Sequence, residues 1–164
     1  IVALKANGPR IKPKVRLLYT GGHADNPEFF ELLQQNDAHV VSDNTGFGTR
    51  AADVLICEDG DPLEAIINYY FEEKPAATRQ MGTQVERMER LLDLVKQYKA
   101  DGVVASRLYM CDLWAFEHFL MRKRLHENNV PFLELEVDYT PEGQGQIKTR
   151  VQAFVESLAD RQTA

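Results

Sequence analysis

Short apolar runs alternate with amphipathic stretches along almost the whole chain, and this alternation restricts the possible folds more than any other feature of the sequence. The apolar runs have the length and composition of buried β-strands. Four such strands are expected, at residues 14–20, 39–42, 102–106 and 131–137. Because strands that alternate with helices pair in parallel through right-handed crossovers, the sequence predicts an α/β domain.

The stretches between the strands show the signals of helices. Asn26 and Asp61 each precede a proline, and both are expected to cap a helix. In residues 83–98 one face has apolar side chains at helical spacing, namely Val85, Met88, Leu91, Leu92 and Val95. Further helices are expected at residues 112–128, capped by Asp112, and after residues 143–146. This order predicts a doubly wound, flavodoxin-like four-stranded parallel sheet with helices on both faces.

The length of 164 residues suits one domain. Gly8, Pro9 and Pro13 mark residues 1–13 as an expected linker from an upstream domain, and residues 14–164 are expected to form a single domain. The net charge of −6 argues against binding to nucleic acid or to an anionic membrane surface, since both need a concentrated basic face.

Two further features predict the cellular compartment. No apolar run approaches the roughly 18 residues that span a membrane, and no secretory signal is found. The two cysteines, Cys57 and Cys111, are too few for a disulfide framework. We therefore expect two free thiols in the reducing cytoplasm.

Ligands of parallel sheets bind beyond the carboxyl ends of the strands. The first expected strand leads there into Gly21, Gly22 and His23, and the third leads into Arg107. His23 could be an acid–base group or an ordinary turn residue. Arg107 could bind an anionic ligand or could be a solvated surface side chain. The sequence assigns no residue a catalytic role.

Residues 46–51 read Gly-Phe-Gly-Thr-Arg-Ala, which fits the G-x-G-x-x-A pattern of dinucleotide-binding loops. That pattern requires a first strand before the loop and a helix directly after it. Here it follows the second expected strand, and no amphipathic stretch comes next, so dinucleotide binding is not expected. The sequence has no P-loop, C-x-x-C, H-E-x-x-H or G-x-S-x-G motif.

Cys111 lies between the third expected strand and the expected helix cap Asp112. The N-terminus of a helix presents free N–H groups and partial positive charge, which suit a thiolate that acts as a metal ligand or nucleophile. The alternative is a small buried side chain, as most free cysteines are. Burial is expected for Cys57, which follows Leu55 and Ile56.

The other charged positions give weaker signals. His118 and His126 lie two turns apart on one expected helix, which is too far for a shared metal. A solvated charged face is expected on the helix of residues 83–98, formed by Glu86, Arg87, Glu89 and Arg90.

An ordered set of segments resembles a known family. The segments are 48–50, 59–65, 100–104 (Ala-Asp-Gly-Val-Val), the pair Cys111-Asp112, 129–139 and 143–156. The last four resemble the C-terminal domain of an iron–sulfur subunit in the benzoyl-CoA reductase / 2-hydroxyacyl-CoA dehydratase family, and segments 48–50 and 59–65 resemble the middle segment of the same family. The resemblance covers about residues 14–158.

The resemblance implies an enzyme subunit that passes low-potential electrons into a CoA thioester. The outcome would be aromatic ring reduction, or 2-hydroxyacyl-CoA dehydration through a ketyl radical. The resemblance also implies a 4Fe–4S cluster shared with a missing upstream domain, with Cys111 as one metal ligand. Its implied partners are a homologous second subunit and an ATP-dependent activator that donates the electron. By itself, the chain would be inactive.

The last expected helix should begin near the same edge of the sheet as Cys111. Its residues Gln144, Gln146, Thr149 and Arg150 are therefore candidates for the surroundings of the cluster or the thioester, together with Gly21, Gly22, His23 and Arg107. The alternative is that the four helical residues only cap and solvate their helix.

The sequence also departs from the family. Many relatives have further cysteines near the position of Gly46 and just after that of Pro75, where this chain has none. Two other functions therefore remain open. One is a non-catalytic scaffold or partner domain of the same fold, in which Cys111 is merely packed. The other is a stand-alone flavodoxin-like domain that binds a small phosphorylated ligand at its glycine loops.

Overall fold

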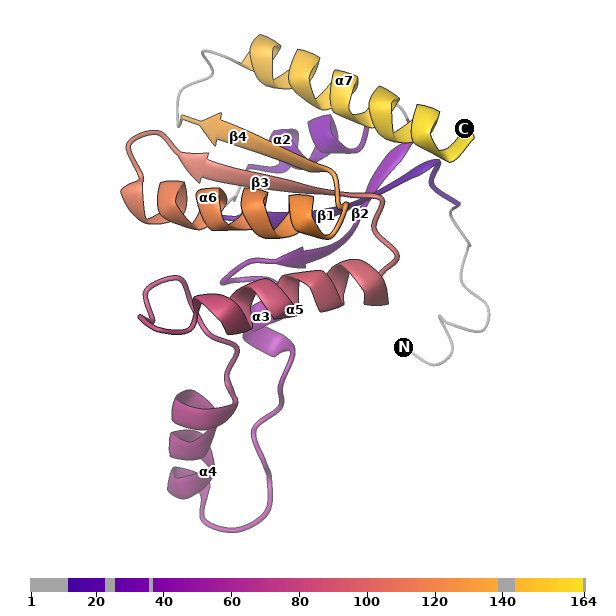
Figure 1. Ribbon diagram of the computed structural model, residues 1–164. Helices are drawn as coiled ribbons and strands as arrows, with labels where there is room; N and C mark the ends of the chain where they lie inside the picture. Colours follow the sequence, from indigo (N-terminus) through magenta and orange to yellow (C-terminus); the bar gives the residue numbers. More distant parts are fainter. Residues whose placement is uncertain (1–11, 23–25, 36, 139–143, 164) are drawn as a thin grey trace.

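A four-stranded parallel sheet forms the centre of the molecule (Figure 1). The computed structural model describes residues 12–22, 26–35, 37–138 and 144–163. Its strands are β1 (Val15–Gly21), β2 (Ala38–Asn44), β3 (Gly102–Leu108) and β4 (Phe132–Val137). Their order is β2-β1-β3-β4, and every neighbouring pair is parallel. The predicted doubly wound α/β fold is confirmed, because this order is that of flavodoxin-like sheets.

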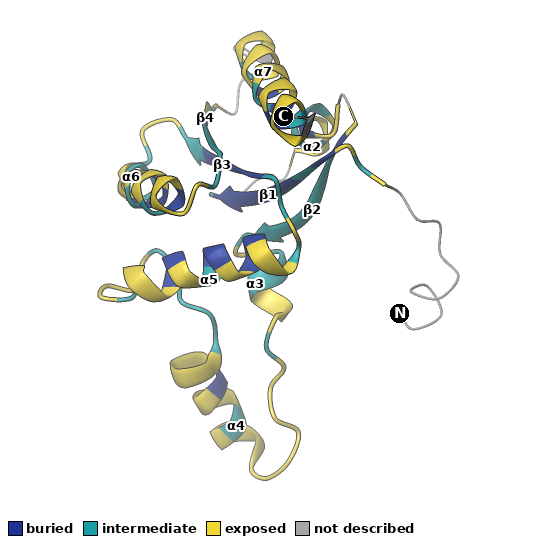
Figure 2. Cartoon of the chain, turned by 45° about the vertical axis from the view of Figure 1, so that its right-hand side comes forward, coloured by how far each residue is buried: buried dark blue, intermediate teal, exposed yellow. Residues whose placement is uncertain are grey.

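Helices cover both faces of the sheet (Figures 1 and 2). Helices α2 (Pro27–Leu33) and α7 (Gln144–Thr163) pack on one face, and α5 (Gln84–Gln97) and α6 (Asp112–Glu127) pack on the other. The predicted apolar stripe of α5 is buried except at Val85, which is 67% exposed. Three short elements lie between β2 and α5, namely α3 (Thr49–Ala52), α4 (Pro62–Asn68) and the π-helix η1 (Tyr69–Glu73).

Two apolar clusters flank the sheet. On one face Val15, Leu17 and Tyr19 pack with residues of α2 and α7. On the other face Leu18 and Val103 pack with residues of α5 and α6. Successive side chains of a strand point to opposite faces, so a central strand that is covered on both sides must be apolar throughout. This is why the middle of β1, Leu17-Leu18-Tyr19, is a run of apolar residues that are all fully buried.

Two of the three predicted helix caps are confirmed. The side chain of Asn26 accepts a hydrogen bond from the Glu28 N–H, and that of Asp61 accepts from the first turn of α4. At α6 the N-cap is Cys111 and not Asp112, so that prediction is wrong by one residue. The reason is a turn in which the Cys111 N–H donates to the Leu108 carbonyl at 3.1 Å, so the helix starts one residue earlier.

Residues 54–74 leave the sheet domain as an arm that contains α4 and η1 (Figures 1 and 2). Tyr69 is its one buried residue. Cys57 lies in the arm and is exposed, so the expected burial of this cysteine is wrong. Leu55 and Ile56 beside it are apolar, but no part of the sheet domain covers them, and they are 83% and 38% exposed.

Among the helices in the described ranges, none has both the length and the apolar content needed to cross a bilayer. The predicted linker falls mostly on residues 1–11, which lie outside the described residues.

Candidate functional site

The carboxyl ends of all four strands lie at one edge of the sheet, because every pair is parallel. The described residues that leave this edge are Gly22 after β1, residues 45–48 after β2, residues 109–111 after β3 and Asp138 after β4. His23 and residues 139–143 lie outside the described residues.

The end of β1 closes tightly against β3. Gly21 has φ +129°, and a Cβ there would lie 2.1 Å from the Ser106 carbonyl oxygen, so only glycine fits. The Gly22 N–H donates to the same carbonyl at 2.8 Å, and a Cβ on Gly22 would lie 3.5 Å from Trp114 Nε1 in the first turns of α6. The neighbouring Tyr19 hydroxyl is hydrogen-bonded to the Ser106 hydroxyl, and burial raises the pKa of Tyr19 to about 12. The two glycines therefore bring the end of β1 beside the helix that Cys111 begins.

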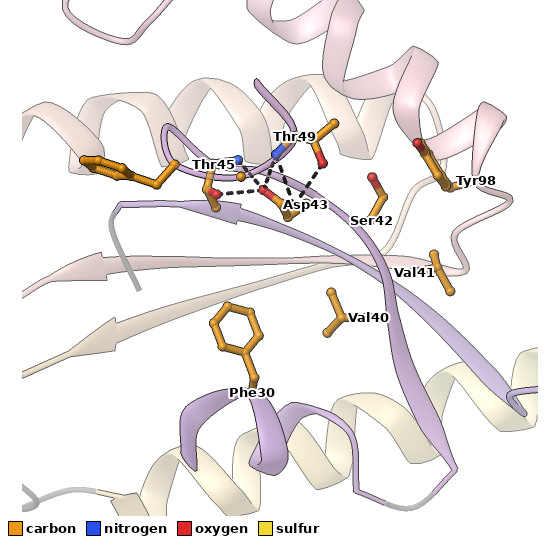
Figure 3. Close-up of a pocket in the computed structure, with 10 residues that line it drawn as sticks. Phe30, Val40, Val41, Ser42, Asp43, Thr45, Thr49 and Tyr98 are labelled. Atoms are coloured by element: carbon orange, nitrogen blue, oxygen red, sulfur yellow. Dashed lines mark hydrogen bonds between the residues drawn. The ribbon is translucent and has the colours of Figure 1, made fainter. Parts of the chain in front are cut away.

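At the end of β2, Asp43 holds the following loop together (Figure 3). Its carboxylate accepts hydrogen bonds from the backbone N–H and the hydroxyl of both Thr45 and Thr49, at 2.7–3.3 Å. Burial opposes ionisation of Asp43, but these hydrogen bonds outweigh it and lower its pKa. A Cβ on Gly48 would lie 2.0 Å from Asp43 Oδ1, so the second glycine of the G-x-G-x-x-A segment leaves room for this carboxylate.

An open cavity of about 510 Å³ lies beside this loop, lined by ten residues that include Phe30, Val40, Asp43, Phe47 and Tyr98. The helix after the loop, α3, has only four residues. A dinucleotide-binding fingerprint needs a full helix behind its loop, and the loop of residues 45–48 is not followed by one. The Asp-x-Thr spacing of residues 43–45 is the sequence signal that would have identified Asp43 as a loop anchor.

At the end of β3, Cys111 is half-buried at the N-terminus of α6. Met110 before it has φ +62°, which turns the chain sharply into the helix. Cys111 makes no side-chain capping hydrogen bond, so its sulfur is not used to satisfy the helix. In the part of the chain that the structure describes, no three side chains of His, Cys, Asp or Glu are grouped so that they could hold a metal. Cys111 therefore has no metal-binding group around it among the described residues.

Several apolar side chains near Cys111 in the sequence are exposed. Tyr109 and Met110 precede it and are 64% and 77% exposed, and Leu113 and Phe116 follow it on α6 at 41% and 75%. Exposed apolar side chains that gather in one region often mark a contact with other protein.

Arg107 lies at the same end of β3, but its guanidinium is paired with carboxylates of β4. Its Nη2 forms an ion pair with Glu136, the residue opposite it on β4, and its Nε lies 3.6 Å from Glu134 Oε1. Arg107 is thus neither a free solvated side chain nor an unpaired cation, and any anionic ligand would compete with these two carboxylates.

The candidates on α7 mostly serve local structure. The Thr149 hydroxyl donates to the Gly145 carbonyl at 3.0 Å, and Arg150 Nη2 donates to the Glu134 carbonyl at 2.7 Å. Gln146 is exposed, and Gln144 is the first residue of the helix. These contacts fit the alternative that the residues cap, solvate and dock their helix, and a role toward a ligand remains untested.

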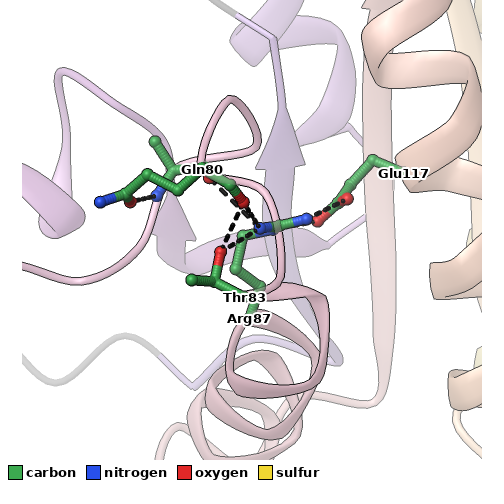
Figure 4. A network of polar contacts seen from close by, with 5 residues as sticks. Gln80, Thr83, Arg87 and Glu117 are labelled. Carbon is green, nitrogen blue, oxygen red and sulfur yellow. Dashed lines mark hydrogen bonds and ion pairs between the residues drawn. The ribbon is translucent and has the colours of Figure 1, made fainter.

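A buried ion pair that was not predicted from the sequence joins α5 and α6 (Figure 4). Arg87 Nε and Nη2 donate to the two carboxylate oxygens of Glu117 at 2.7 and 2.8 Å. Arg87 Nη1 donates to the Ala77 and Gln80 carbonyls and to the Thr83 hydroxyl at 2.6–3.2 Å. The expectation of a wholly solvated face on α5 is therefore wrong at Arg87, because the N-terminal part of α6 packs over it.

The chain was compared with known proteins. The family model described as 2-hydroxyglutaryl-CoA dehydratase, D-component, matches residues 2–158. The "Putative dehydratase subunit YjiM" of Escherichia coli (strain K12) is 29% identical over 156 residues, which are 92% of this chain and 39% of that protein. The (R)-phenyllactyl-CoA dehydratase beta subunit of Clostridium sporogenes is 25% identical over 94% of this chain and 41% of its own length. The (R)-2-hydroxyglutaryl-CoA dehydratase subunit beta of Acidaminococcus fermentans is 25% identical over 80% of this chain and 36% of its own. The chain thus spans about two fifths of the length of these relatives.

Proposed function

Because the chain belongs to the 2-hydroxyglutaryl-CoA dehydratase D-component family, we propose that it is the C-terminal part of an iron–sulfur subunit of a 2-hydroxyacyl-CoA dehydratase. The relatives named above are dehydratase subunits, and this favours dehydration over aromatic ring reduction. The substrate would be a CoA thioester. The partners would be a second, homologous subunit and an ATP-dependent electron donor.

The observation that carries this proposal is the position of Cys111. It stands at the carboxyl edge of the sheet and at the N-terminus of α6, and its sulfur makes no capping hydrogen bond. A helix N-terminus stabilises negative charge, and a thiolate there is a suitable iron ligand. When bound, a 4Fe–4S cluster would supply the low-potential electron for the thioester.

The number of cysteines in the chain fits a cluster whose ligands come from more than one part of the protein. Such clusters are held mainly by cysteine thiolates, typically about four, and the chain has two cysteines. Cys57 is exposed in the arm, so Cys111 is the one cysteine at the sheet edge. The remaining ligands would come from the upstream part of the protein, and the exposed apolar side chains near Cys111 in the sequence suit a surface that this part covers.

The test is Cys111→Ala in the full-length protein, purified anaerobically with its second subunit. We expect loss of most cluster iron and of turnover, with an unchanged fold, because a half-buried loop residue adds little to the core. Cys57→Ala is the matched control and should retain iron, activity and stability, since this thiol is exposed. Full iron content and activity in Cys111→Ala would refute the ligand assignment and favour a non-catalytic scaffold.

A further inference from the structure

The arm, residues 54–74, presents an unpartnered apolar stripe to solvent. Its helical part, residues 62–73, has apolar side chains at positions i, i+3, i+4, i+7 and i+8, which form one face of a helix. These residues are Leu63 (66% exposed), Ile66 (43%), Ile67 (50%), Tyr70 (55%) and Phe71 (81%). Figure 2 shows the arm as almost wholly exposed. A face of this kind normally packs against protein.

Few contacts with the described part of the sheet domain stabilise the arm. Tyr69 is its one buried residue, and the Tyr69 hydroxyl reaches the Ala51 carbonyl at 3.4 Å. A cavity of about 460 Å³ lies between the base of the arm and α5, and Asp53, directly before the arm, forms an ion pair with Arg90 of α5 at 2.6 Å. Isolated helices of fewer than about 12–15 residues are marginal in water. Additional protein packed on the stripe would supply the burial that this segment lacks.

The acidic charge of the chain is concentrated in the arm. It contains six acidic residues and one basic residue, namely Glu58, Asp59, Asp61, Glu64, Glu72, Glu73 and Lys74. Five of the chain's six net negative charges therefore lie in these 21 residues, and the other residues are nearly balanced, with 19 acidic and 18 basic. Two such arms packed against each other would bring like charges together, which disfavours a second copy of the chain as the occupant.

We propose that the arm docks through its apolar stripe into an apolar groove with a lysine- and arginine-rich rim on the second subunit of the enzyme. The groove chemistry follows from the stripe and from its acidic surroundings. The choice of partner rests on the proposed function, and it is supported by relatives that are named as beta subunits.

The test measures binding of the purified full-length protein to its purified second subunit by calorimetry, at low and high salt. Phe71→Glu should weaken binding about tenfold or more, because it places a charge within the apolar contact, at the most exposed side chain of the stripe. Met81→Glu is the matched control, since Met81 is 97% exposed and lies outside the arm, and it should bind like the unaltered protein. The double variant Glu64→Lys, Glu72→Lys should weaken binding mainly at low salt, where charge attraction is least screened.

The possible results separate this inference from the proposed function. A complex that both arm variants leave unchanged overturns the docking inference, and so does a dimer of the protein alone that Phe71→Glu dissolves. Complete absence of a complex overturns both proposals. Arm-dependent binding together with full iron in Cys111→Ala supports the arm and refutes the cluster assignment.

Discussion

At the scale of single residues, His118 shows how far packing can move a side chain from its ordinary chemistry. It is fully buried on α6, between the rings of Trp114 and Phe132, whose centroids lie 6.0 and 6.2 Å away. Its Nδ1 lies 3.3 Å from Glu134 Oε1, without the geometry of a hydrogen bond. Burial lowers the pKa of His118, and the Glu134 carboxylate opposes this only in part. His118 is therefore neutral in the folded protein at pH 7.

This predicts a loss of stability in mild acid. The unfolded chain takes up a proton at His118 near its ordinary pKa of 6.5, and the folded chain resists protonation to lower pH. The stabilising contribution is thus present above about pH 6.5 and is lost as the pH falls below it, with a slope of up to about 1.4 kcal/mol per pH unit. Urea unfolding between pH 7.5 and 5 should show this slope, and His118→Gln should flatten it. If the free energy of unfolding of the His118→Gln variant falls with pH as steeply as that of the unaltered protein, the attribution of this fall to His118 is wrong.

At the scale of elements, the ion pair of Arg87 and Glu117 joins α5 to α6. Both side chains are about nine-tenths buried or more, and Arg87 also fixes the loop before α5 through backbone carbonyls at residues 77 and 80. The guanidinium thus connects α5 with the loop directly before it and with α6, about 30 residues further along the chain (Figure 4).

Removal of one partner should therefore be costly. Glu117→Ala leaves a buried guanidinium without its carboxylate, and we expect the free energy of unfolding to fall by about 3 kcal/mol. The matched control is Glu89→Ala, which breaks the pair of Glu89 and Arg124 between the same two helices. That pair is exposed, so its loss should cost less than about 1 kcal/mol. Equal destabilisation of the two variants in urea would show that the buried pair has no special role.

At the scale of the whole molecule, the sheet and the four helices packed on its faces (α2, α5, α6 and α7) form the core, and the arm is nearly independent of it. The two core clusters include no residue of the arm among the described side chains. Val54 and Lys74, at the two ends of the arm, line the same cavity, so the chain leaves and returns to the domain at neighbouring points.

Replacement of residues 55–73 by a short glycine–serine linker should therefore leave a folded sheet domain. We expect the free energy of unfolding to fall by no more than about 3 kcal/mol, the scale of the burial that is lost with one large apolar side chain, here Tyr69. Circular dichroism should lose only the helical signal of the arm, and urea unfolding should remain cooperative. Loss of cooperative unfolding would show that the arm belongs to the core.

Local patterns in the sequence are sufficient to predict the four strands, the helices packed on them and their order. The parallel sheet, the caps at Asn26 and Asp61 and the position of Cys111 at a strand-to-helix junction all follow from local patterns, because apolar periodicity and capping residues act over a few neighbours. The segments that resemble the family add the expectation that Cys111 is a ligand of an iron–sulfur cluster, and this expectation stays a prediction.

Which polar and apolar side chains are buried depends on the tertiary packing and not on the local pattern. The local pattern around Arg87 is that of a solvated helix face, yet α6 buries it, while Leu55, Ile56 and Cys57 look like buried residues and lie exposed in the arm. Burial of a side chain depends on which distant segment packs against it, here across about 30 residues from Arg87 to Glu117. Local spacing holds no information on that contact, so the helix-to-helix ion pair and the uncovered arm became visible only in the folded chain.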